Sequence, residues 1–147
     1  MSKYFENLKR SYQEIICGQV GVPNIKTFRN WLTEINTLRN SCAHHSRVWN
    51  HTMSNAISMK GTEEIEYFQT LDLTLESRQK IYAHISILWY LVKKIGPSST
   101  WIEKIADLID SKPAIDSCPF TSMGFPDNTG FPREKFGLPI TKKTVVA

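Results

Sequence analysis

The sequence of 147 residues is poor in cysteine and has no long hydrophobic run. Its three cysteines, Cys17, Cys42 and Cys118, are too few and too scattered for a disulfide framework, and an odd number is typical of a reducing compartment. The most apolar stretch, residues 81–92, is well short of the roughly 20 residues that a membrane span needs. The charged N-terminal residues lack the apolar core of a secretory signal. We therefore expect a cytoplasmic protein with no membrane partner.

The surplus of positive charge is small and uneven. There are 18 Lys and Arg residues against 14 Asp and Glu residues, a formal net charge of +4, and the basic excess lies in residues 1–60. A local basic excess can attract polyanions such as RNA, but charge alone assigns no function. With 41% hydrophobic residues, the chain can build one ordinary core without disulfide or metal staples.

Apolar residues at helical spacing predict four main helices, of which the first two lie in the N-terminal third of the chain. One runs over residues 5–16 and is stopped by Gly18 and Gly21. The other begins after Asn24, a residue type that caps helices well, and keeps a single apolar stripe as far as Trp49, about seven turns.

The remaining two helices follow a stretch without a clear period. Residues 53–74 mix acidic and isolated apolar positions, which predicts a loop with a short helix or strand pair. A third helix is expected with its apolar stripe over residues 81–95 and with Asp72 or Thr74 near its start. A fourth is expected over residues 101–109, where Thr100 and Glu103 form a capping-box pattern. The predicted fold class is all-α, a bundle of about four main helices.

The composition changes beyond residue 112, because five of the seven prolines and three of the seven glycines lie in residues 113–147. The sequence therefore predicts a helical domain over residues 1–112 and an irregular segment over residues 113–147, with a frayed tail at residues 142–147. Aromatic side chains of this segment are expected to pack partly on the helices. They are Phe120, Phe125, Phe131 and Phe136.

Polar residues that could do chemistry are concentrated in residues 39–50. On a continuous helix, Asn40, His44 and Arg47 would point away from the apolar stripe and form one polar ridge. By the same geometry His45 would point close to the stripe. We therefore expect His45 to be a packed core histidine rather than a catalytic base.

Such a ridge suits phosphodiester chemistry on RNA. A histidine can move a proton at neutral pH, and arginines can hold a phosphate and stabilise its developing charge. Arg39 lies at the edge of the stripe, from which its long side chain can reach the ridge of its own helix or of a second copy. One histidine is half of an acid–base pair, so two helices facing each other across a homodimer would complete the site. Attack by the 2′-hydroxyl would leave a 2′,3′-cyclic phosphate.

Zinc is the other chemistry that this block suggests, because Cys42 lies near His44 and His45. On one helix Cys42 and His44 would point about 200° apart, which does not suit ligands that must share a face. We expect no metal and no cofactor, and Cys42 is interpreted as a small apolar residue of the stripe. His51 and His84 have no chemistry nearby and are assigned to structure.

Residues 39–50 (RNSCAHHSRVWN), followed late in the chain by residues 123–126 (MGFP), resemble the abortive-infection (Abi-like) family. Within the block, Arg39 and His44 are similar in type and spacing to the arginine–histidine signature of HEPN ribonucleases. The resemblance covers most of residues 1–126. It implies an all-helical HEPN domain, metal-independent RNA cleavage, a homodimer that brings two motifs together, and a role in phage defence (abortive infection) or a toxin–antitoxin system.

The resemblance also implies roles for individual residues. Arg39 and His44 would be catalytic, and Asn40 would help to position them. The residues that match the block with supporting roles are His45, Arg47 and Asn50.

Members of the Abi-like family are typically longer than this chain, which resembles their C-terminal half and begins at a segment (MSKYFENL) that is internal in them. The expected partners are therefore RNA, a second copy of the chain, and either an antitoxin or a protein that supplies the missing N-terminal half. The alternative function is a catalytically silent remnant that binds RNA or protein. A helical dimerisation domain without a nucleic-acid role is a third hypothesis.

Overall fold

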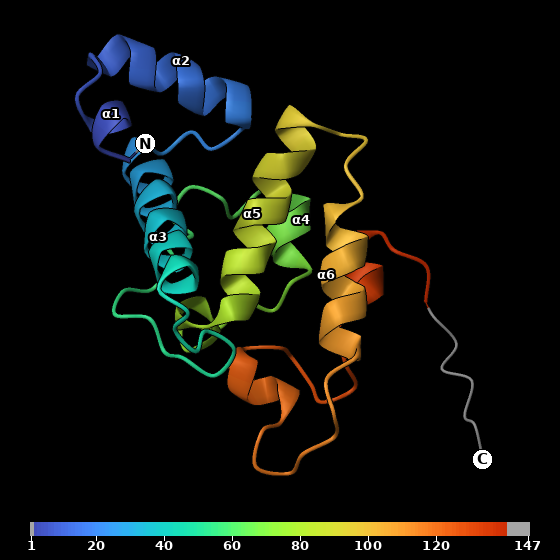
Figure 1. The fold of residues 1–147 in the computed structure, drawn as a ribbon. Helices are drawn as coiled ribbons and strands as arrows, with labels where there is room; N and C mark the ends of the chain where they lie inside the picture. Colours follow the sequence, from blue (N-terminus) through green and yellow to red (C-terminus); the bar gives the residue numbers. More distant parts are fainter. Residues whose placement is uncertain (1, 141–147) are drawn as a thin grey trace.

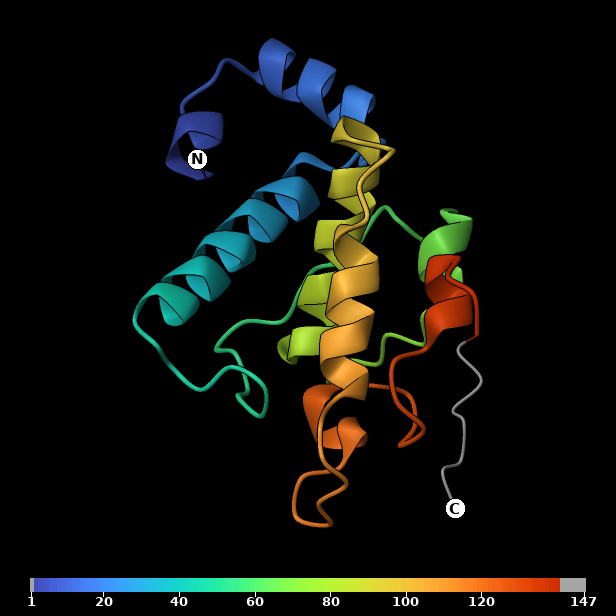
Figure 2. The same ribbon diagram turned by 45° about the vertical axis from the view of Figure 1, so that its right-hand side comes forward.

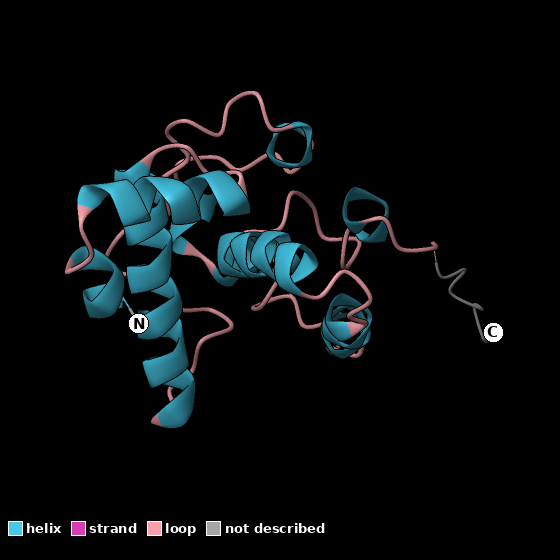
Figure 3. Ribbon diagram, turned by 90° about the horizontal axis from the view of Figure 1, so that it is seen from above, coloured by secondary structure: helices cyan, strands magenta, loops and turns pink. Residues whose placement is uncertain are grey.

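The computed structural model describes residues 2–140, and within this range the chain is all-α, as the sequence predicts. Figure 3 shows helices joined by loops, with no strand in the described range. None of the helices described is both long enough and apolar enough to cross a membrane. The α-helices are α1 (Ser2–Glu6), α2 (Arg10–Val20), α3 (Ile25–Ala43), α4 (Glu66–Gln69), α5 (Ile81–Ile95) and α6 (Trp101–Asp110), and the 3₁₀-helices are η1 (Ser77–Gln79), η2 (Phe120–Met123) and η3 (Arg133–Phe136) (Figure 1).

The core is built around α5, which has α3 on one side and α6 on the other (Figures 1 and 2). All residues from Tyr82 to Ile87 are buried, and so is Trp89. The ring of Trp31 on α3 meets that of Tyr90 edge-on, with 6.0 Å between the ring centroids. On the other side, the ring of Trp101 on α6 stacks on Trp89, with centroids 6.4 Å apart. Apolar packing therefore covers α5 from both sides, as its predominantly apolar sequence requires.

Two polar side chains in this core bond to the preceding turn of α5. His84 Nδ1 lies 2.9 Å from the carbonyl oxygen of Lys80, and Ser86 Oγ donates a hydrogen bond to the carbonyl oxygen of Tyr82 at 2.8 Å. Burial lowers the pKa of His84 and so favours its neutral form. The prediction that His84 is structural is confirmed by its complete burial.

The starts of two helices test the predicted caps. Asn24 caps α3 as predicted, because its Oδ1 accepts a hydrogen bond from the backbone N–H of Thr27 at 3.1 Å. The helix α6 also begins where the sequence places it, but Thr100 makes no side-chain cap. Ser99 Oγ accepts from the N–H of Trp101 instead, at 3.3 Å.

The prediction of one continuous helix over residues 5–16 is wrong, because the chain turns a corner between α1 and α2. Gln13 is buried, and its Nε2 donates to the carbonyl oxygen of Phe5 at 2.8 Å, which satisfies a backbone group at the end of α1. The ring of Phe5 packs edge-on against Phe28 of α3, with centroids 5.0 Å apart. Gly18 lies inside α2, and the helix ends at Gly21, whose φ of 72° is left-handed.

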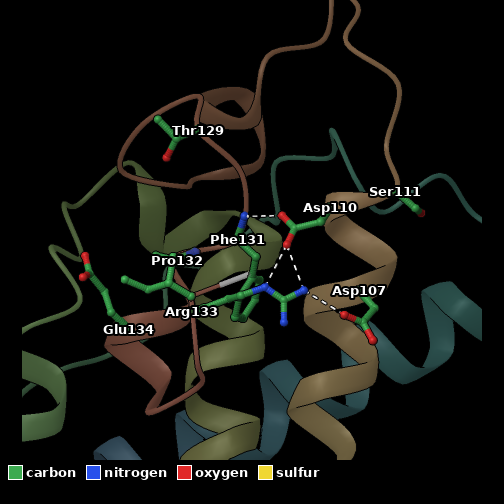
Figure 4. A pocket seen from close by; sticks show the side chains of 9 residues that line it. Asp107, Asp110, Ser111, Thr129, Phe131, Pro132, Arg133 and Glu134 are labelled. Atoms are coloured by element: carbon green, nitrogen blue, oxygen red, sulfur yellow. Dashed lines mark hydrogen bonds and ion pairs between the residues drawn. The ribbon is translucent and has the colours of Figure 1, made fainter. Parts of the chain in front are cut away.

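Residues 111–140, the described part of the segment after α6, are irregular apart from η2 and η3, and an arginine clamp fastens them to α6 (Figure 4). Arg133 Nη2 lies 2.7 Å from Asp107 Oδ1 and 2.9 Å from Asp110 Oδ2. Asp110 Oδ1 also accepts from the N–H of Phe131 at 2.9 Å. Of the four phenylalanines expected to pack, Phe120 is half-buried and three are buried: Phe125, Phe131 and Phe136.

Two further predictions concern the C-terminal part. The boundary at residue 112 stays a prediction, because α6 and the segment after it share the core. The frayed tail expected at residues 142–147 lies outside the described residues.

The stretch between α3 and η1 contains only the short helix α4, in agreement with the expected loop. We call residues 53–62 the anchored loop, because side chains on one face of α3 hold it. These side chains are spaced i, i+3, i+4 and i+7, so they lie in one row along the helix. The row consists of Thr27, Asn30, Trp31 and Glu34.

The anchored loop is held by a series of hydrogen bonds from this row. Most of them use the backbone of the loop, which therefore needs no regular structure to satisfy its polar groups. The bonds are Thr27 Oγ1 to the Lys60 carbonyl (2.6 Å), Trp31 Nε1 to the Ser58 carbonyl (2.7 Å), the Ser58 N–H to Asn30 Oδ1 (2.7 Å), Asn30 Nδ2 to the Ala56 carbonyl (3.3 Å) and Asn55 Nδ2 to Glu34 Oε1 (3.3 Å).

Glu34 is the charged member of this row and is 1% exposed. Burial raises the pKa of its carboxyl group, and the hydrogen bond from Asn55 acts in the opposite direction with a smaller effect. Among residues 2–140 no cationic side chain forms an ion pair with Glu34, and a buried carboxyl group without such a partner costs stability when it ionises. The apolar stripe in the sequence does not predict that Glu34 is buried, because this residue lies between the apolar positions of α3.

Candidate functional site

The helix α3 ends in a Schellman motif inside the block that carries the sequence signature. The N–H of Ser46 donates to the carbonyl of Ser41 at 2.9 Å, and the N–H of His45 donates to the carbonyl of Cys42 at 3.1 Å. His44 is the C-cap of the helix, and the next residue, His45, has a left-handed φ of 53°. Glycine usually takes this position, although histidine tolerates it better than most residues. The predicted continuation of the helix to residue 49 is therefore wrong, because the chain leaves the helix at His45.

The end of α3 breaks the predicted polar ridge into two parts. Asn40 and His44 stay one helical turn apart, because the N–H of His44 donates to the carbonyl of Asn40 at 3.0 Å. Arg47 lies in irregular chain and is not on the ridge. The guanidinium of Arg39 does reach Asn40, since its Nη1 donates to Asn40 Oδ1 at 3.1 Å. The Asn40 side chain thus bonds to Arg39, whereas its link to His44 is the main-chain bond of the helix.

We call residues 44–52 the motif loop, and its side chains are open to solvent apart from half-buried Val48. The apolar stripe of α3 stops at Leu38, which is 8% exposed. The predicted placement of Cys42 and Trp49 on a buried stripe is therefore wrong, since Cys42 is exposed and Trp49 is 38% exposed. The candidate residues are all exposed as well: Arg39, Asn40, His44, His45, Arg47 and Asn50.

The exposure of His45 overturns a specific prediction. A packed core histidine was expected on the assumption that α3 continued in helical register. The left-handed turn at His45 redirects the chain, so this side chain lies on the surface beside His44 in the sequence. Two imidazoles are therefore accessible at this end of the helix.

The far end of the motif loop is fixed to the start of α5. Lys80 Nζ donates to Thr52 Oγ1 at 2.6 Å. The N–H of Met53 donates to the carbonyl of Gln79 at 2.8 Å, and Gln79 Nε2 donates back to the carbonyl of Met53 at 3.1 Å. Sequence reasoning missed Lys80 and Gln79, because no local pattern links residues so far apart in the chain. The only signal was the position of a basic residue directly before a predicted helix.

The arrangement offers cationic and proton-transferring groups on an open surface. A cavity of about 660 Å³ lies between α6 and the C-terminal segment, and none of the candidate residues lines it. Among residues 2–140, no three His, Cys, Asp or Glu side chains come together as metal ligands. The candidate residues themselves offer proton transfer by imidazole and phosphate binding by guanidinium.

This is an all-α protein whose exposed motif lies at the end of one helix, and its N-terminal part matches a known family. Residues 1–50 match the family model described as Abi-like protein. The match includes α1, α2, α3 and all six candidate residues, and it is shorter than the stretch over which the sequence resemblance was expected. No curated protein matches the chain, and no solved structure matches it either.

Proposed function

We propose that this chain is a metal-independent endoribonuclease of the HEPN type that acts in phage defence by abortive infection, or in a toxin–antitoxin pair. The observation that supports this most strongly is the position of the motif. The Arg39 guanidinium bonds to Asn40, and His44 follows one helical turn later at the exposed end of α3, inside the part of the chain that matches the Abi-like family. The positive excess of the N-terminal residues favours a polyanionic substrate.

The proposed reaction is attack of a ribose 2′-hydroxyl on the adjacent phosphorus. The imidazole of His44 accepts the hydroxyl proton while O2′ bonds to phosphorus and the bond from phosphorus to O5′ breaks. The leaving O5′ takes a proton from the His44 imidazolium of a second copy. Arg39 binds the non-bridging oxygens, whose negative charge increases in the transition state. The products are a 2′,3′-cyclic phosphate and a 5′-hydroxyl, and no metal takes part.

The second copy is needed for two physical reasons. His44 of one chain can be either the acid or the base, whereas the reaction uses both at the same time, and the resemblance gives the neighbouring His45 only a supporting role. The motif loop is also open to solvent, so guanidinium–phosphate attraction is weakened by water unless another surface covers it. Two motif loops facing each other in a homodimer would meet both needs.

The test is cleavage of single-stranded RNA in the presence of a chelator. We expect His44→Ala to lower the rate about 10²–10⁴-fold, the range for losing one proton-transfer group. We expect Arg39→Ala to lower it about 10²–10³-fold, the range for losing one group that stabilises the charge of the transition state. His51→Ala is the matched control, because His51 is an exposed histidine of the same loop that lies just outside the signature block of residues 39–50. If both variants cleave as fast as the His51→Ala protein, or if the products lack a cyclic phosphate, the proposal is wrong.

The alternative function is a catalytically silent module that binds RNA or protein through the same residues. It is favoured by the exposure of all six candidate residues on a surface that one chain leaves open. Such a module would bind RNA with an affinity that falls as salt rises, because counterions are released. Binding of this kind, without any cleavage product at protein concentrations that give dimers, would replace the nuclease proposal.

A further inference from the structure

Lys80 lies where three separate parts of the chain meet. It directly precedes α5, its side chain is half-buried, and its Nζ donates to Thr52 Oγ1 at the base of the motif loop, at 2.6 Å. Its backbone is fixed as well, because its N–H donates to the carbonyl of Ser77 at 3.0 Å and its carbonyl faces His84 Nδ1 at 2.9 Å. The ammonium group thus extends from a backbone that is fixed by hydrogen bonds at the start of α5.

The third part of the chain that meets Lys80 is the turn after η2, which packs closely against the aliphatic part of its side chain. Gly124 has a φ of 90°, and a Cβ added there would lie 2.6 Å from Lys80 Cβ. The neighbours Met123 and Phe125 are both buried, so this turn cannot easily withdraw. Glycine is required at this position both by its left-handed backbone and by the close approach of Lys80. The stem of Lys80 is therefore confined while its ammonium group bonds to Thr52.

We propose that Lys80 is a positioning residue for the candidate site. It fixes one end of the motif loop, while the Schellman motif of α3 fixes the other. This inference rests on the proposed nuclease function. When the bond to Thr52 is lost, the loop samples more conformations, so the catalytic geometry is present for a smaller share of the time. We therefore expect the rate of the chemical step to fall and RNA binding to stay unchanged, because the Lys80 ammonium bonds to Thr52 and not to RNA.

The kinetic test compares Lys80→Met, Thr52→Val and the double variant. We expect each single variant to lower kcat about tenfold with KM within about twofold, and the double variant to be no worse than either. Thr52→Ser, which keeps the hydroxyl, and Lys104→Met, which removes an exposed lysine from α6, are the matched controls and should behave as wild type. Lys80→Arg should restore most of kcat.

Two kinetic outcomes would overturn the proposal. Additive losses in the double variant would show that Lys80 and Thr52 act separately. A raised KM for Lys80→Met, with a smaller salt dependence of RNA binding and a silent Thr52→Val, would show that the lysine binds phosphate directly.

A second measurement does not depend on RNA cleavage. Trypsin cleaves after Arg47 in the exposed motif loop, and mass spectrometry can follow this bond alone. We expect Thr52→Val and Lys80→Met to raise the rate of this cut about tenfold over Thr52→Ser and Lys104→Met, at a temperature where all variants remain folded by circular dichroism. Unchanged rates would overturn the positioning role. If the wild-type chain does not cleave RNA, the proposed nuclease function is wrong. The trypsin rates then still decide whether Lys80 holds the motif loop.

Discussion

The motif loop and the anchored loop adjoin in the sequence and are both irregular, but they are held in opposite ways. The motif loop is fixed at its two ends and exposed between them. The anchored loop is bonded along its length to one face of α3 and buries Met53, Ile57 and Thr62. The difference shows that an unperiodic stretch can be either scaffold or candidate site. Its role is decided by whether the neighbouring helix offers side chains that satisfy its backbone.

The largest expected effect comes from breaking the anchored loop. Asn30→Ala removes the acceptor of the Ser58 N–H and the donor to the Ala56 carbonyl, so we expect the free energy of unfolding to fall by about 2 kcal/mol. Urea unfolding measures this. Asn36→Ala, at an exposed asparagine of the same helix, is the control and should change stability little. Equal stability of the two variants would show that the row on α3 does not hold the loop.

Changing the motif loop should have a smaller effect on stability and the opposite sign. His45→Gly places at the left-handed end of α3 the residue that the Schellman motif favours, so we expect a gain of about 0.5 kcal/mol in unfolding free energy. Thermal unfolding of the two proteins side by side checks this. A loss of stability would mean that the His45 side chain makes stabilising contacts that its exposure does not indicate.

The smallest effect tests the buried carboxyl beside the anchored loop. Burial raises the pKa of Glu34 in the folded state, so the free energy of unfolding falls as pH rises through this folded-state pKa. Below the pKa of the unfolded chain the carboxyl group is neutral in both states and does not lower the stability. Glu34→Gln keeps an acceptor for Asn55 and stays neutral. We expect it to be more stable than wild type at pH 8 and equal to wild type at about pH 4. A stability difference that does not vary with pH contradicts the buried ionisation.

Much of the fold could be predicted from the sequence because its helices have one apolar face. The apolar stripe of α5, the position of α6 and the Asn24 cap of α3 follow from periodicity and capping chemistry, whereas α5 begins at Ile81 and not near Asp72 or Thr74. The row from Thr27 to Glu34 could not be predicted, because its partners lie in a loop that has no pattern of its own. The corner after α1 was missed because Gln13, a polar residue, is buried to make it.

The candidate site shows the same division. The identities of Arg39, Asn40 and His44 follow from the sequence block, and the structure joins the side chains of Arg39 and Asn40. The helical register was wrong beyond Ala43, because nothing in the local sequence announces a left-handed turn at a histidine instead of a glycine. Lys80 was missed because its contact with Thr52 is purely tertiary.

The central claim is that the exposed motif loop is half of a site that a second copy completes. The most direct test measures the rate of RNA cleavage per chain against protein concentration, with the dimer fraction of the same samples determined by sedimentation. The account predicts that activity per chain rises in parallel with the dimer fraction and is lost with His44→Ala at every concentration. Constant activity per chain from a protein that stays monomeric would contradict it.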